Sequence, residues 1–170
     1  MSGANTDAER GRTGAGNAGD GESEGQQRVS QAPASTEAQP DPSQPPLVLI
    51  AEDEEPIAEA IALIVEDAGY TPLVAAHGKQ ALELARLRHP ALVITDLMMP
   101  QMDGTQLIAT LRADAEANGH APPPIILMTA AGMKRAQEAD ANALLRKPFE
   151  LDELEELLFR FLGPPPQSPS

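Results

Sequence analysis

The hydrophobic residues of the chain gather in five short runs between residues 47 and 146, separated by segments in which polar residues are frequent. Each run has the length of a β-strand and is rich in Val, Ile and Leu, a composition typical of strands that are buried on both faces. We therefore predict five strands: Leu47–Ala51, Pro72–Ala76, Ala91–Thr95, Pro124–Met128 and Ala143–Arg146.

Helical periodicity appears between the predicted strands. From Ile57 to Ala68, apolar residues follow the spacing i, i+4, i+7 and i+11, and Gly69 stands where this helix would end. Similar patterns are centred on Ala81–Ala85, Leu107–Leu111 and Leu151–Phe161. Apolar strands that alternate with helices predict a parallel sheet covered on both faces, and right-handed crossovers make it a doubly wound α/β domain.

The segments outside this alternation differ in composition. Residues 1–46 consist mainly of Gly, Ala, Ser, Pro and Gln, with too few large apolar residues to offset the entropy of ordering, so we expect a disordered, low-complexity tail. Residues 163–170 (GPPPQSPS) predict a second disordered tail, which leaves residues 47–162 as the folded domain. Gly14, Gly16 and Gly19 match G-x-G-x-x-G, but no strand precedes them and no helix follows, so we interpret the match as chance.

Composition and charge argue against several classes of protein. A formal net charge of -14 disfavours nucleic-acid binding, which needs clustered Lys and Arg to neutralise phosphates. The chain has no cysteine, which removes thiolate metal sites and thiol nucleophiles. No apolar run approaches the roughly 20 residues of a membrane span, and the amino terminus has no signal-peptide core. We therefore expect a cytoplasmic protein that binds neither nucleic acid nor a membrane.

Polar residues follow four of the predicted strands. Glu52 and Asp53 come directly after the first strand, Asp96 after the third, Thr129 after the fourth and Lys147 after the fifth. Ligands of such sheets bind at the carboxyl ends of the strands, so these side chains are expected to lie together. Three carboxylates in one place need a cation, and an all-oxygen site without His or Cys suits Mg²⁺. A carboxylate can also act as a nucleophile and form an aspartyl phosphate.

The sequences around these residues resemble the receiver domain of two-component response regulators. The matching stretches are VLIAEDEEPIAEAI, LVITDLMMPQMDGTQLI, IILMTA and LLRKPFELDELEELL, and they span essentially all of residues 47–162. The resemblance implies a flavodoxin-like sheet with the strand order 2-1-3-4-5. It also implies a role in a bacterial phosphorelay, in which the domain accepts a phosphoryl group from a histidine kinase or a histidine phosphotransfer protein and signals to a downstream protein target.

The resemblance also implies a role for each polar residue. Asp96 would be the phosphoacceptor, and Asp53 would bind Mg²⁺ together with Asp96 and the backbone carbonyl of Met98. Glu52 would act on the ion, often through water in this family. The Thr129 hydroxyl and the Lys147 amine would bind the phosphoryl oxygens. The Lys147–Pro148 peptide bond is expected to be cis.

The sequence departs from the family pattern in two places. Leu144 stands three residues before Lys147, where many receivers carry a Tyr or Phe that moves together with the threonine. Only 17 residues separate Thr129 from Lys147 (146 − 130 + 1), about one helical turn fewer than the family implies, so we predict a shortened fourth helix. Met98 and Ala131 stand where the family positions the attacking water, and because neither side chain is polar, we expect slow autodephosphorylation.

Three functions are compatible with these residues. The first is a stand-alone receiver without an output domain, which catalyses its own phosphorylation with Mg²⁺ and is not an enzyme with a separate substrate. The second is a receiver-like scaffold that works without phosphorylation, which Leu144 and the short fourth helix favour. The third is a phosphatase, but such enzymes usually need an acid two residues after the nucleophile, where this chain has Met98. The sequence leaves the choice between monomer and dimer open.

Overall fold

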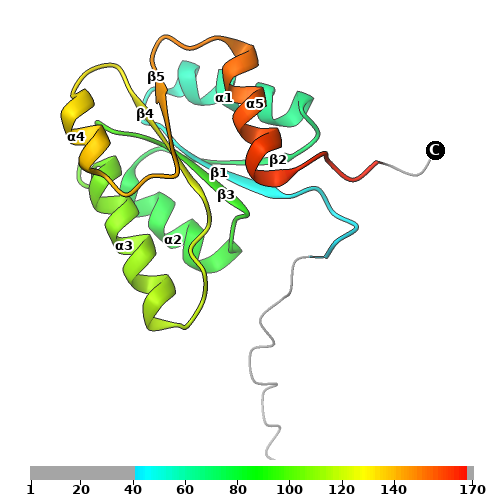
Figure 1. The fold of residues 1–170 in the computed structure, drawn as a ribbon, viewed down its shortest axis with the longest axis horizontal. Coiled ribbons are helices and arrows are strands. Elements are labelled where there is room, and N and C mark those ends of the chain that lie inside the picture. Colours follow the sequence, from blue (N-terminus) through cyan, green and yellow to red (C-terminus); the bar gives the residue numbers. More distant parts are fainter. Residues whose placement is uncertain (1–40, 168–170) are drawn as a thin grey trace, which may run out of the picture. The chain divides into compact units, whose positions relative to one another are not determined.

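The structure, a computed structural model, describes residues 41–167, which form a five-stranded parallel sheet with helices on both faces. The strands are β1 (Leu47–Ala51), β2 (Thr71–Ala75), β3 (Leu92–Asp96), β4 (Ile125–Thr129) and β5 (Ala143–Arg146). They lie in the order β2-β1-β3-β4-β5 (Figure 1). This is the predicted order of a doubly wound, flavodoxin-like sheet, and the prediction is confirmed.

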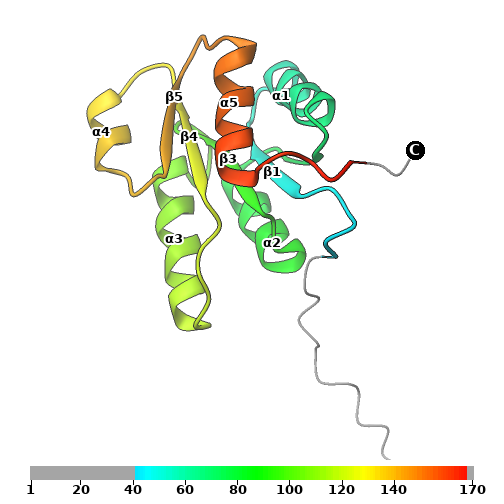
Figure 2. The same ribbon diagram turned by 45° about the vertical axis from the view of Figure 1, so that its right-hand side comes forward.

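A helix connects each strand to the next, and another follows β5. The helices are α1 (Glu55–Asp67), α2 (Gly78–Arg88), α3 (Gly104–Ala117), α4 (Met133–Glu138) and α5 (Leu151–Leu162). Helices α1 and α5 pack on one face of the sheet, whereas α2, α3 and α4 pack on the other (Figures 1 and 2). Parallel strands need such crossover connections, and the helices bury the sheet on both faces.

The two faces of the sheet have separate hydrophobic cores. Val93 of β3 and Leu127 of β4 pack against α2, α3 and α4, whereas the next residues, Ile94 and Met128, pack against α1 and α5. This alternation follows from the two-residue period of a strand. Every residue of β3 and β4 is buried, so these strands form a rigid centre for the side chains at their carboxyl ends.

The strand ends differ from the predicted ones by a single residue in three cases. Strand β2 begins and ends one residue earlier than predicted, and β3 and β4 begin and end one residue later. Asp96 and Thr129 are therefore the last residues of their strands. Their polar side chains do not interrupt the backbone ladder, in which Asp96 pairs with Met128 and Thr129 with Arg146. Hydrophobic runs locate a buried strand but do not fix its last residue.

Helix α4 has six residues, which confirms the prediction of a shortened fourth helix. Ala136 is its buried residue. Two salt bridges connect this segment to α3: Arg135 pairs with Asp103 at the start of α3, and Arg112 pairs with Asp140 at 2.9 Å. A helix of this length is not stable alone, so contacts with its neighbours must hold it in place.

The predicted tails are described only in part. Residues 1–40 and 168–170, which make up most of the first tail and the end of the second, lie outside the described residues. After α5, the Gly163 carbonyl accepts a hydrogen bond from the Tyr70 hydroxyl, and Pro165 lies close to Gly69. This segment therefore lies against the turn between α1 and β2. None of the helices within residues 41–167 is long and apolar enough to span a bilayer.

Gly104 is expected to be intolerant of a larger side chain. It is the buried first residue of α3, and its N–H donates to the Leu97 carbonyl at 2.9 Å. A Cβ at this position would lie 2.3 Å from the carbonyl oxygen of Asp96 and 2.9 Å from Cδ1 of Leu127. Because the backbone would have to move, we expect Gly104→Ala to lower the free energy of unfolding by about 3 kcal/mol, as measured by equilibrium denaturation.

Gly119→Ala serves as the comparison. Gly119 has a φ of 69°, so a side chain there is strained, but a Cβ would meet no atom within 4 Å. The expected loss is about 1 kcal/mol. Equal losses for the two variants would contradict the proposed clash at Gly104.

Candidate functional site

The predicted site residues lie at the carboxyl ends of four strands. Glu52 and Asp53 follow β1, Asp96 ends β3, Thr129 ends β4 and Lys147 follows β5. Backbone hydrogen bonds continue past the strands, since the amide of Lys147 donates to the carbonyl of Thr129 at 2.9 Å. The sheet ladder therefore fixes the backbone from which these side chains project.

Three carboxylates and one ammonium meet at this edge of the sheet. Glu52, Asp53 and Asp96 each offer a carboxylate oxygen, and these oxygens lie within 4.8 Å of one another. The Nζ atom of Lys147 lies 2.6 Å from Oε2 of Glu52 and 3.2 Å from Oδ1 of Asp96. These four side chains, which we call the acidic cluster, carry three negative charges against one positive charge when all are ionised.

Burial controls the ionisation of the acidic cluster. Burial raises the pKa of both Glu52 and Asp96; Lys147 opposes the rise at each carboxyl group, and Asp53 adds to it at Asp96. Burial also disfavours the Lys147 ammonium, but the hydrogen bond to Glu52 and the charge of Asp96 outweigh this effect and raise the pKa of Lys147. The lysine is therefore charged at neutral pH, whereas the environment disfavours the charge on the two buried carboxylates.

The raised pKa of Asp96 predicts how the stability of the metal-free domain depends on pH. A carboxyl group whose pKa is higher in the folded state binds more protons when the protein is folded. Its contribution to the free energy of unfolding therefore falls as the pH rises from its unfolded-state pKa to its folded-state pKa. For Asp96 this window begins at the ordinary value of 3.8 and extends upward. At pH 7, in a chelator, Asp96→Asn is therefore expected to unfold a few degrees higher than the wild type, the shift expected for about 1 kcal/mol.

Calorimetry over a range of pH values checks this expectation. As the pH falls toward 4, the wild-type carboxyl group becomes protonated and the difference in unfolding temperature should shrink. A difference that stays constant between pH 7 and pH 4 would contradict the assignment of the effect to Asp96.

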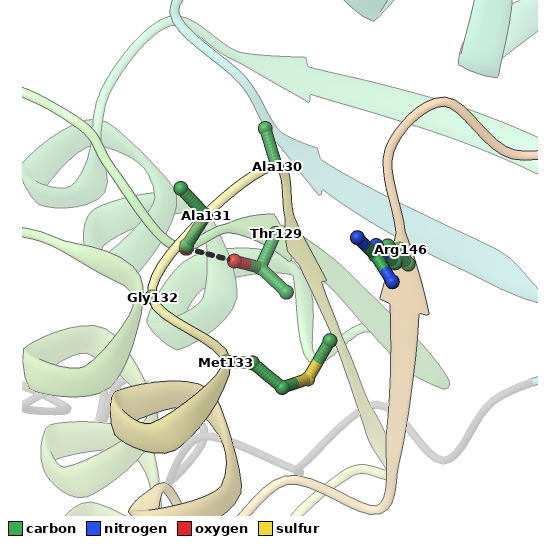
Figure 3. A pocket seen from close by; sticks show the side chains of 6 residues that line it. All are labelled: Thr129, Ala130, Ala131, Gly132, Met133 and Arg146. Carbon is green, nitrogen blue, oxygen red and sulfur yellow. Dashed lines mark hydrogen bonds between the residues drawn. The ribbon is translucent and has the colours of Figure 1, made fainter.

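Thr129 and Met98 are not members of the acidic cluster. Thr129 is buried, and its hydroxyl donates a hydrogen bond to the carbonyl of Ala131 (Figure 3). The side chain of Met98, two residues after Asp96, is 62% exposed. The Lys147–Pro148 peptide bond is cis, as the resemblance implied.

The contacts of Glu52 could not be read from the sequence. Its Oε1 atom accepts a hydrogen bond from the amide of Glu54 at 3.2 Å, and its Oε2 atom accepts one from Lys147. Glu52 is 1% exposed, whereas the neighbouring Asp53 is exposed. An acidic pair after a strand does not reveal which member turns inward, because the alternation of the strand ends there.

An acidic cluster of this kind can hold a hard cation and an anionic group together. Its donors are all carboxylate oxygens, which Mg²⁺ prefers, and Lys147 supplies a fixed positive charge next to Asp96. The geometry therefore suits phosphoryl chemistry, in which charge develops on oxygen atoms.

Comparison with known proteins identifies the family. A family model for the response regulator receiver domain matches residues 48–159. The chain belongs to the response regulator receiver family. Among solved structures, this receiver resembles the receiver domain of a sensor histidine kinase from Pseudomonas aeruginosa PAO1, with 27% sequence identity and a TM-score of 0.62, covering 70% of this chain and 98% of that one. That receiver was solved with a magnesium ion coordinated in its active site cleft.

Two curated relatives differ in how much of their length this receiver covers. Response regulator Rre1 from Synechocystis sp. is 34% identical over 126 residues, which are 71% of this chain and 53% of Rre1. The polar-differentiation response regulator DivK from Brucella ovis is 31% identical over 120 residues, which are 68% of this chain and 95% of DivK. This receiver therefore spans about half the length of Rre1 and nearly all of DivK.

Proposed function

We propose that this receiver accepts a phosphoryl group on Asp96 from a histidine kinase or a histidine phosphotransfer protein, and that the phosphorylated domain signals by contact with a downstream protein. The observation that carries this proposal is the position of the Lys147 ammonium, 3.2 Å from a carboxylate oxygen of Asp96. A nucleophile beside a fixed cation suits phosphoryl transfer, because the transition state carries negative charge on the phosphoryl oxygens.

The acidic cluster also suits Mg²⁺. Carboxylate oxygens within 4.8 Å of one another repel unless a cation joins them. Asp53 and Asp96 would hold the ion together with the backbone carbonyl of Met98, and Glu52, whose oxygens accept hydrogen bonds from the protein, would act through water. When bound, the ion would neutralise charge on the phosphoryl oxygens.

The proposed transfer needs no further cofactor. A carboxylate oxygen of Asp96 attacks the phosphorus of a phosphohistidine, the P–O bond forms as the P–N bond breaks, and the imidazole leaves with the electron pair and takes up a proton from water. The Lys147 ammonium binds a phosphoryl oxygen of the product. The Thr129 hydroxyl, once it leaves the carbonyl of Ala131, donates to another. The receiver thus catalyses its own modification, and we propose that it does so in the cytoplasm, where its kinase would present the phosphohistidine.

A small acyl-phosphate donor tests the proposal without knowledge of the natural kinase. With Mg²⁺, the full chain is expected to gain the mass of one phosphoryl group, and fragmentation should locate it on the peptide that contains Asp96. A chelator should suppress the gain. The absence of any gain, or a gain located on another residue, would contradict the proposed function.

We also propose that the phosphorylated receiver loses its phosphoryl group slowly. The side chain of Met98 is exposed beside Asp96, and Ala131 follows Thr129 by two residues; neither side chain can orient a water molecule by hydrogen bonding. The half-life of the acyl phosphate is expected to be severalfold shorter in Met98→Asn, because this substitution adds a polar group near the phosphoryl group. Mass spectrometry over time measures the phosphorylated fraction. If this fraction fell as fast in the wild type as in Met98→Asn, the proposed slow loss would be contradicted.

A second candidate function is a scaffold that binds its partner without phosphorylation. Two observations favour it: Leu144 on β5, which stands where many receivers have an aromatic residue, and the six residues of α4. Partner binding that does not respond to a phosphodonor would support this candidate. Binding that changes strongly with the donor would exclude it.

A further inference from the structure

Met98 is the most exposed methionine of the residues that the structure describes. Its side chain is 62% exposed, whereas Met133 is 37% exposed, the adjacent Met99 is 8% exposed and Met128 of β4 is fully buried. Met99 and Met128 belong to the two hydrophobic cores, one on each face of the sheet. The thioether of Met98 is therefore open to solvent, while those of Met99 and Met128 are shielded.

Met98 lies close to the proposed phosphoacceptor. Asp96 ends β3, and Met98 follows it by two residues in the loop that leads to α3. Consecutive Cα atoms are about 3.8 Å apart, so the Cα atoms of these two residues lie within about 7.6 Å of each other. A polar group added to the side chain of Met98 would therefore be within reach of water that approaches Asp96.

The thioether of Met98 can be oxidised without competition from a thiol, because the chain has no cysteine. Hydrogen peroxide oxidises methionine to the sulfoxide. The sulfur atom attacks one peroxide oxygen, an S–O bond forms as the O–O bond breaks, and the peroxide is reduced to water. Susceptibility follows exposure, so Met98 should react before the buried methionines.

The folded domain can accommodate a sulfoxide at Met98. A sulfoxide is polar, so it costs little where the side chain meets water, but it leaves an unsatisfied oxygen where the side chain is buried. The same change at Met128 would place that oxygen in the core that contains Ile94 and Leu154. The pattern of exposure therefore separates a modification that the fold tolerates from one that would damage it.

We propose that Met98 is a site of reversible oxidation, and that its sulfoxide shortens the lifetime of the phosphoryl group on Asp96. The effect on lifetime rests on the proposed function. A thioether is only a weak hydrogen-bond acceptor, whereas a sulfoxide oxygen is a strong one and can orient a water molecule toward the phosphorus atom. Oxidation would thus supply the polar group that the unmodified side chain lacks.

The modification can be reversed. Methionine sulfoxide reductases restore the thioether: the sulfoxide oxygen leaves as water while a dithiol is oxidised to a disulfide. Two types of reductase act on the two epimers of the sulfoxide, both of which peroxide produces. The exposure of Met98 makes its side chain accessible to these enzymes in the folded protein.

Peptide mapping of the full chain after brief treatment with hydrogen peroxide tests the site. Met98 is expected to gain an oxygen atom about tenfold faster than Met99, because susceptibility follows exposure. These residues are adjacent, so one fragmented peptide reports both, and in denaturant their rates should become similar. Equal rates at the two residues in the folded chain, or faster oxidation of Met99 or Met128, would overturn the proposal.

The lifetime of the acyl phosphate tests the consequence. The oxidised chain is separated from peroxide, phosphorylated with an acyl-phosphate donor and Mg²⁺, separated from the donor and followed by mass spectrometry. We expect molecules with the Met98 sulfoxide to lose the phosphoryl group severalfold faster than unoxidised molecules, and treatment with both reductases and dithiothreitol to restore the slow loss. Met98→Leu should respond to neither peroxide nor reductase. Met133→Leu, which removes the next most exposed thioether, should retain the peroxide effect.

The outcomes distinguish this proposal from the proposed function. Equal rates of loss from oxidised and unoxidised molecules, or a peroxide effect that persists in Met98→Leu, would overturn the role of Met98 although the receiver is phosphorylated. Absence of any phosphoryl group on the unoxidised chain would contradict the proposed function and the effect on lifetime together. The mapping experiment would still decide whether Met98 is the oxidised site, because it requires no phosphorylation.

Discussion

Replacement of Asp96 by asparagine is expected to lower the rate of phosphoryl labelling by on the order of a thousandfold or more. The amide keeps the shape of the side chain but has no anionic oxygen to attack phosphorus. Asp53 cannot substitute for it, because the Lys147 ammonium pairs with Glu52 and Asp96 rather than with Asp53. The measurement is mass spectrometry of the full chain after timed incubation with an acyl-phosphate donor and Mg²⁺.

Asp103→Asn is the matched control for this experiment. Asp103 accepts a hydrogen bond from the amide of Gln106 at the start of α3 and pairs with Arg135, but it is not part of the acidic cluster. Asparagine caps a helix about as well as aspartate does, so labelling should stay within about twofold of the wild type. Loss of labelling in both variants would indicate damage to the loop, and labelling that persists in Asp96→Asn would show that another residue accepts the phosphoryl group.

Lys147→Gln is expected to slow labelling by about a hundredfold. The glutamine side chain can still donate a hydrogen bond, but it cannot balance the charge that develops on the phosphoryl oxygens. The ammonium also neutralises Glu52, which is 1% exposed. Its loss therefore raises the pKa of Glu52 further and lets this carboxyl group take up a proton at a higher pH. Initial rates over a range of donor concentrations measure the effect.

The control for Lys147→Gln is Lys79→Gln, which changes an exposed lysine at the start of α2. It should label at the wild-type rate. Thermal unfolding of both variants separates chemistry from stability, because a folded Lys147→Gln protein that labels slowly has lost a catalytic contact. A Lys147→Gln variant that is folded and labels like the wild type would remove this lysine from the mechanism.

Much of the fold could be predicted from the sequence because its central strands, β1, β3 and β4, are almost entirely buried. Such strands are nearly continuous apolar runs, and β1 and β5 have the predicted bounds. The ends of β3 and β4 were placed one residue too early, because Asp96 and Thr129 are polar side chains on backbone that still belongs to the ladder. The short α4 was predictable from the distance in sequence between Thr129 and Lys147.

The contacts within the site could be predicted from the sequence less well than the strands and helices. The positions of the site residues follow from topology, since parallel strands bring their carboxyl ends to one edge. The hydrogen bonds of Glu52 to Lys147 and to Glu54 depend on the direction in which a side chain turns after its strand has ended.

The bond between Tyr70 and Gly163 determines what can be learned from the intrinsic fluorescence of the protein. The chain has one tyrosine and no tryptophan, so a single phenol accounts for the emission. This phenol lies at the amino end of β2, whereas the acidic cluster lies at the carboxyl ends of the strands. The signal therefore follows the docking of residues 163–166 and global unfolding, but an ion or a phosphoryl group at Asp96 needs a separate optical reporter.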